Sequence, residues 1–99
     1  MTYDLTEKLR FREDPKLIVR DTRLTVRSDA EVVLRLMDLI AEKGEVGGAR
    51  EALGLLLSAA DQKKLAAMHL KMDDYLEVLK AAVQLALGED PEETAPAGE

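Results

Sequence analysis

The chain has 99 residues, with 14 Lys and Arg against 20 Asp and Glu, so its formal net charge is −6 with the single histidine neutral. This length suits one small domain. The absence of cysteine excludes a disulfide scaffold, a thiolate metal site and a cysteine nucleophile. The excess of acidic over basic residues argues against a nucleic-acid partner, and three aromatic residues are few for stacking on bases. We therefore expect neither cofactor nor metal, and no enzymatic activity.

Charge and apolar runs define the organisation of the chain. No apolar run approaches the roughly 20 residues of a membrane span, so we expect no membrane partner and a cytoplasmic protein. Residues 1–28 contain seven basic and five acidic side chains, a net charge of +2. Residues 29–99 contain seven basic and fifteen acidic side chains, a net charge of −8. We expect an irregular leader, a single domain and a disordered acidic tail, over residues 1–14, 15–88 and 89–99 respectively.

A β-hairpin is predicted over residues 16–27. Its first strand, 16–20, is rich in β-branched residues. Its second, 23–27, alternates strictly, which places Leu24 and Val26 together on the buried face. Asp21-Thr22 is the predicted turn, although a β-branched threonine resists positive φ.

The first of four predicted helices covers about residues 29–43. Ser28-Asp29-Ala30-Glu31 has the spacing of a capping box, in which the Ser28 hydroxyl and the Glu31 carboxylate each accept from a backbone N–H. Gly44 is the predicted stop.

Three more helices follow at about residues 48–57, 61–70 and 73–87. Ser58 and Asp61 form the predicted start of the third helix, and Gly88 ends the fourth. The expected fold is mainly α, a small four-helix domain preceded by a short β-hairpin.

Groups suited to catalysis are scarce in this sequence. His69 is the only imidazole, and Ser28 and Ser58, the serines that a triad would need, are better explained as helix caps. The acidic residues at 73–77 lie where the positive end of a helix dipole favours negative charge. Both features therefore favour structural roles.

The first and fourth predicted helices carry unusually wide apolar faces. Each face spans roughly 200° of the helical wheel, about twice the width of an ordinary surface helix. In the first helix the sector is widened by Ala30, Leu34 and Ala41. We expect these faces to form the core and to leave part of their area for partner or self contacts. The core candidates are Val33, Leu36, Met37, Ile40, Leu79, Val83 and Leu87; the contact candidates are Leu36, Met37, Leu39, Ile40, Leu79, Val83, Leu85 and Leu87.

The order of elements resembles that of the tail assembly chaperones of long-tailed bacteriophages and prophages. The resemblance covers about residues 16–90 and consists of patterns of residue class. It rests on the run Leu24-Thr25-Val26-Arg27-Ser28-Asp29 leading into an apolar-striped helix, and on the Gly-broken helix ending Ala52-Leu53-Gly54-Leu55-Leu56-Leu57.

The resemblance implies a binding role in the host cytoplasm. Family members coat the long helical tape-measure protein until tail-tube subunits polymerise around it, and many have a longer frameshifted form. The implied partners are the tape-measure protein, the tail-tube protein and the longer form, together with homo-oligomerisation. The alternative is a small oligomeric adaptor or regulatory protein without a tape-measure partner.

Overall fold

The computed structural model describes residues 1–89, and it confirms a mainly helical fold preceded by a two-stranded antiparallel hairpin. The tail predicted for residues 89–99 lies, apart from Glu89, outside the described residues. The elements are β1 (Lys16–Val19), β2 (Thr22–Thr25), α1 (Ala30–Lys43), α2 (Ala49–Leu56), α3 (Ala59–Ala66) and α4 (Met72–Ala86).

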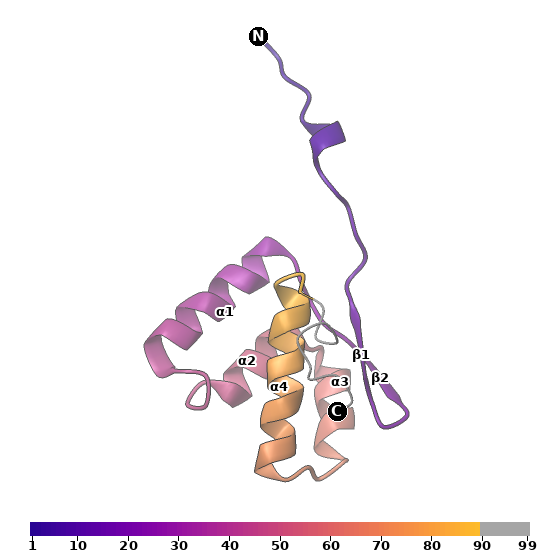
Figure 1. Cartoon of the computed structure of the whole chain (residues 1–99), viewed down its shortest axis with the longest axis vertical. Helices are drawn as coiled ribbons and strands as arrows, with labels where there is room; N and C mark the ends of the chain where they lie inside the picture. Colours follow the sequence, from indigo (N-terminus) through magenta and orange to yellow (C-terminus); the bar gives the residue numbers. More distant parts are fainter. Residues whose placement is uncertain (90–99) are drawn as a thin grey trace.

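Residues 1–13 form an arm that runs away from the helical body (Figure 1). All of them are exposed, and their only regular structure is a 3₁₀ turn, η1, at Thr6–Lys8. At the base of the arm, Asp14 Oδ1 accepts hydrogen bonds from the Ser28 hydroxyl at 3.0 Å and from the Ser28 backbone N–H at 3.3 Å. These bonds tie the arm to the segment that leads into α1.

The hairpin turn lies one residue earlier than predicted. Val19 pairs with Thr22, so Arg20 and Asp21 form the turn, with Arg20 at φ 57°. The β-branched Thr22 is therefore in the strand, where its backbone conformation is favoured. The predicted alternation of the second strand is confirmed, because Leu24 and Val26 are both fully buried.

The predicted capping box at the start of α1 does not form. Asp29 is the N-cap residue and no side chain caps the helix. The Ser28 hydroxyl is directed to Asp14 instead, and Glu31 is exposed. The tertiary anchor of the arm thus replaces the local cap. The predicted C-terminal stop is confirmed at Gly44, whose φ of 79° suits a residue without Cβ.

The third helix is shorter than predicted, running over Ala59–Ala66 rather than 61–70. After it, His69 adopts φ 53°, which ends the helical path before α4. Helices α2 and α4 lie within one residue of their predicted bounds, and α4 is followed by Gly88 at φ 85°.

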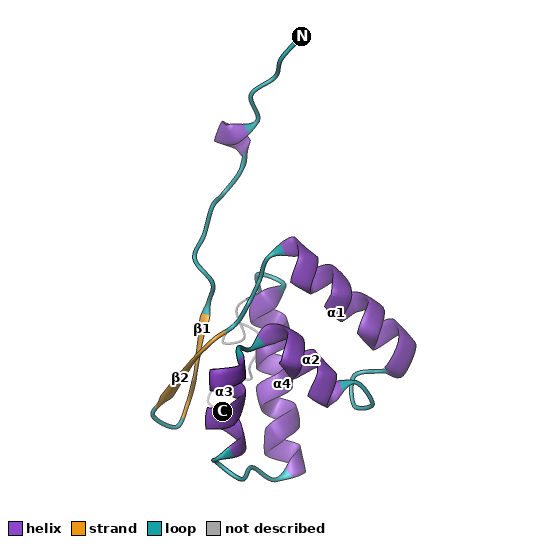
Figure 2. Ribbon diagram, turned by 180° about the vertical axis from the view of Figure 1, so that it is seen from behind, coloured by secondary structure: helices purple, strands orange, loops and turns teal. Residues whose placement is uncertain are grey.

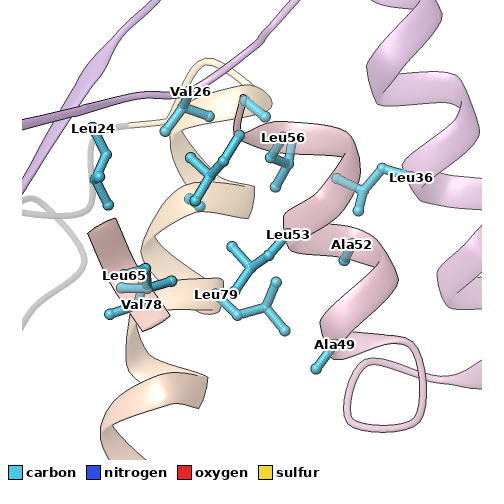
Figure 3. Packing of buried hydrophobic residues seen from close by; sticks show 13 residues of the cluster. Leu24, Val26, Leu36, Ala49, Ala52, Leu53, Leu56, Leu65, Val78 and Leu79 are labelled. Atoms are coloured by element: carbon cyan, nitrogen blue, oxygen red, sulfur yellow. The ribbon is translucent and has the colours of Figure 1, made fainter. Parts of the chain in front are cut away.

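The core lies between α2, α4 and the inner face of the hairpin (Figure 3). Helix α2 is central, because it packs against α1, α3 and α4. Figure 2 shows α1 at the outer side of the domain, opposite the hairpin. The buried cluster comprises Leu24, Val26, Leu36, Ala49, Ala52, Leu53, Leu56, Leu57, Leu65, Val78, Leu79, Ala82 and Ala86.

Candidate partner-binding surface

Helix α1 is attached to the domain by one flank only. Leu36 is its single buried residue, at 1% exposure, and it points toward α2 (Figure 3). Val33 and Ile40 are half-buried and pack against the core. Leu34 and Met37 remain 58% and 55% exposed. A helix with 14 residues and one buried side chain leaves much of its apolar area in contact with water.

The apolar residues of α1 divide into two sets. Leu36 and its half-buried neighbours face the core, while a second set is exposed. The exposed set recurs at intervals of four, three and four residues, which is one line along a helix. We name it the α1 stripe; it consists of Ala30, Leu34, Met37 and Ala41.

Helix α4 has buried residues along its length up to Ala86, but its neighbouring apolar side chains are less covered toward the C-terminal end. Leu79 is 1% exposed, whereas Val83 and Leu85 are half-buried and pack against the core. Leu87, directly after the helix, is 45% exposed. The apolar face therefore continues from the core to the surface at this end of the domain.

A surface depression of about 460 Å³ lies where the start of α1 meets the end of α4. Val33 from α1 and Leu85 and Leu87 from α4 line it. Arg12, Glu13 and Glu89 contribute charged side chains to its lining. We name Val33, Leu85 and Leu87 the α1–α4 surface.

The predicted contact residues fall into three classes. Leu36 and Leu79 belong to the buried core, as expected for core candidates. Met37 and Leu87 were also predicted in the core, and that assignment is wrong because both are about half exposed. The half-buried predicted contact residues are Leu39, Ile40, Val83 and Leu85.

The predicted cap at Ser58 is confirmed. Its hydroxyl accepts a hydrogen bond of 3.1 Å from the Asp61 backbone N–H. Asp61 has a further function that its local sequence does not signal. Its side chain accepts from the Thr25 backbone N–H at 3.0 Å, and it is only 8% exposed. The outer edge of β2 is thereby held against α3, and the Arg27 N–H completes this edge by donating to the Leu56 carbonyl at 2.8 Å.

Charged side chains join the connection between α1 and α2. Lys43, in the last turn of α1, donates a hydrogen bond to Glu51 of α2. This bond and the attraction of the Glu51 carboxylate raise the pKa of Lys43 above its ordinary value. In the arm, hydrogen bonds from the Thr6 hydroxyl and N–H lower the pKa of Asp4. Both pairs are at the surface, where ion pairs contribute little stability.

A second depression, of about 640 Å³, lies between the hairpin and the start of α4. Leu17 and Val78 contribute apolar lining, and Lys71, Asp74 and Glu77 line it from the N-cap and the first half of α4. The exposed His69 is at its border. Its lining of mixed apolar and charged side chains is typical of a solvated surface groove, not of a preformed binding site.

Comparison of the chain with protein-family models, with curated proteins and with solved structures finds no match. Among the helices formed by residues 1–89, none combines the length and apolarity needed to cross a bilayer. The same residues contain no group of three or more His, Asp and Glu side chains placed to hold a metal ion.

Proposed function

We propose that this protein is a tail assembly chaperone of a long-tailed phage or prophage, acting in the host cytoplasm. Its partner would be the tape-measure protein, which it would keep soluble until the tail tube forms. The proposal is one of binding, without turnover. The observation that carries it is the α1–α4 surface, an apolar area that continues from the core to a depression at the end of the domain.

The half-buried side chains of this surface suit an amphipathic helix from a partner. Val33 and Leu85 pack against the core on one side and retain accessible area on the other. A partner helix gains stability by covering such area, at about 25 cal/mol per Å² of apolar surface removed from water. Contacts made through aliphatic side chains such as Val33, Leu85 and Leu87 select weakly among apolar partners, which suits a chaperone for a long chain with many similar helices.

The charge of residues 29–99 supports a solubilising role. Residues 29–99 have a net charge of −8, from seven basic and fifteen acidic side chains. A complex coated with many such domains repels its copies and resists aggregation.

The test is co-expression with the product of the longest helical gene beside its own, followed by measurement of the soluble fraction and of co-purification. We expect the full chain to keep that product soluble. Leu87→Asp should abolish capture, because Leu87 lines the depression while being exposed enough to leave the fold intact. Val46→Asp is the matched control, since Val46 is 62% exposed in the connection between α1 and α2.

Capture that survives Leu87→Asp would refute the assigned surface. Absence of any long helical partner during phage or prophage growth, with only copies of the chain recovered, would favour the alternative of an oligomeric adaptor. The α1–α4 surface would then be an interface between copies.

A further inference from the structure

The N-terminal arm exposes apolar side chains that nothing in the described chain covers. Leu5, Leu9 and Phe11 are 47%, 48% and 82% exposed, and Tyr3 is 67% exposed. The arm thus holds two of the three aromatic residues of the protein. Aromatic side chains bury large areas at interfaces, and a concentrated exposed apolar segment indicates an interaction site.

The end of the arm combines this apolar character with positive charge. Residues 8–12 contain three cations and no anion. Leu9 is extended, at φ −96° and ψ 151°, and successive side chains of an extended segment point to opposite sides. In an extended segment over residues 9–12, Leu9 and Phe11 share one side, and Arg10 and Arg12 share the other. Lys8 already lies over the Tyr3 ring, 5.7 Å from its centroid.

The α1 stripe complements the arm in two respects, because it is apolar and is bordered by negative charge. Leu34 and Met37 are at its centre and are both more than half exposed. Beside it runs a line of exposed charged residues, consisting of Glu31, Arg35, Asp38 and Glu42. Three carboxylates against one guanidinium make this line net negative, and Lys43 is already paired with Glu51.

Spacing also agrees between the two segments. Side chains two apart in an extended chain are separated by about 7 Å, and neighbours on one helix face by about 5–6 Å. Leu9 and Phe11 can therefore contact Leu34 and Met37 together. Arg10 and Arg12 then lie on the other side of the arm, and their long side chains would have to fold back along the arm to pair with the carboxylates that border the stripe.

We propose that the arm of one copy docks on the α1 stripe of a second copy, and that the exchange is reciprocal. The arm is anchored at its base by Asp14 and Ser28 and runs outward from the body (Figure 1), so a second molecule receives it. In a two-fold symmetric dimer, each arm covers the α1 stripe of the other copy, so that no arm and no stripe is left uncovered. This interface adjoins the α1–α4 surface, because Arg12 and Ala30 also line the depression, but it does not depend on the function proposed above.

A charge-exchange experiment on the full chain tests the docking. The arm-reversed variant is Arg10→Glu with Arg12→Glu, and the stripe-reversed variant is Asp38→Arg with Glu42→Arg. All four positions are exposed, so we expect each variant to keep the fold, which its circular dichroism spectrum checks. Sedimentation equilibrium should show dimers of the unmodified chain, and each variant alone should weaken dimerisation about tenfold or more.

The mixture of the two variants gives the decisive result. Each arm then faces a stripe of opposite charge, so heterodimers should form with an affinity near that of the unmodified chain. The chain carrying all four changes should dimerise again for the same reason. Recovery in both cases is not expected if the changes only perturb folding or net charge.

Introduced cysteines distinguish exchange between copies from docking within one copy, because the protein has no cysteine of its own. Phe11→Cys mixed with Leu34→Cys should give a disulfide-linked dimer under mild oxidation. Phe11→Cys mixed with Val46→Cys is the control for random collision, as Val46 is equally exposed.

Three results would overturn the proposal. The first is a chain that stays monomeric at millimolar concentration, and the second is a dimer whose affinity arm reversal does not change. The third is a double variant, with Phe11→Cys and Leu34→Cys, that forms only an intramolecular disulfide. None of these bears on capture of a tape-measure protein, so the two proposals fail separately.

Discussion

The carboxylate of Asp61, in the first turn of α3, accepts a hydrogen bond of 3.0 Å from the backbone N–H of Thr25 in β2. The two residues are 36 positions apart. The Asp61 N–H donates to the Ser58 hydroxyl, so one residue belongs to both the helix cap and the contact between helix and hairpin. A hairpin of two short strands is marginal by itself, and this bond helps to hold it on the helices.

Replacement of Asp61 by Ala should destabilise the domain by about 1–3 kcal/mol, because the half-buried Thr25 N–H loses its acceptor. Asp61→Asn retains an acceptor oxygen and should destabilise it less. Urea unfolding monitored by circular dichroism measures both free energies. Equal losses for the two variants would show that the hydrogen bond to Thr25 has no net effect.

Ser58→Ala should reduce the free energy of unfolding by about 0.5–2 kcal/mol, the usual effect of removing a helix N-cap. The variant leaves the Asp61 N–H without its acceptor. Ser58→Asp is the control, since aspartate also caps helices and should restore most of the stability. A destabilisation that Ser58→Asp fails to recover would mean that the hydroxyl acts in another way.

Glu31→Ala should change stability by no more than about 0.5 kcal/mol, as expected of a surface substitution. Its carboxylate takes no part in capping α1, where no side-chain cap bond is present. The same unfolding experiment measures the effect. A loss near that of Ser58→Ala would instead demonstrate the capping box in solution.

Two leucines of the fourth helix region should differ strongly in their contribution to stability. Leu79→Ala removes a core side chain that is 1% exposed and should destabilise the domain by about 2–5 kcal/mol. Leu87→Ala removes a side chain that is 45% exposed and should have a small effect. Thermal unfolding of both variants checks the difference. Similar losses would place Leu87 in the core.

Much of the fold follows from local patterns in the sequence. The alternation at Leu24 and Val26 predicts their burial, and Gly44 and Gly88 mark helix ends because left-handed backbone favours glycine. Ser58 caps α3 as its spacing predicts. These features depend on interactions within a few residues, which the order of the amino acids specifies directly.

The sequence-based predictions fail at three places, and at one of them a distant partner competes with the local signal. The Ser28 hydroxyl bonds to Asp14, so the capping motif it belongs to remains unused. The turn moves to Arg20-Asp21 because pairing of Val19 with Thr22 satisfies the strand preference of threonine. The third helix ends early, and the chain reverses at His69.

The candidate surfaces show the same division. The sequence by itself determined the helical class, the width of the apolar faces and the acidic exterior, since periodicity and composition are local properties. Only the tertiary structure decided that Leu36 is buried while Leu34 and Met37 are exposed, and that the arm leaves the body. The reason is physical. A helical wheel defines which residues lie together, but burial depends on what packs opposite them, and α1 meets the rest of the domain along one flank.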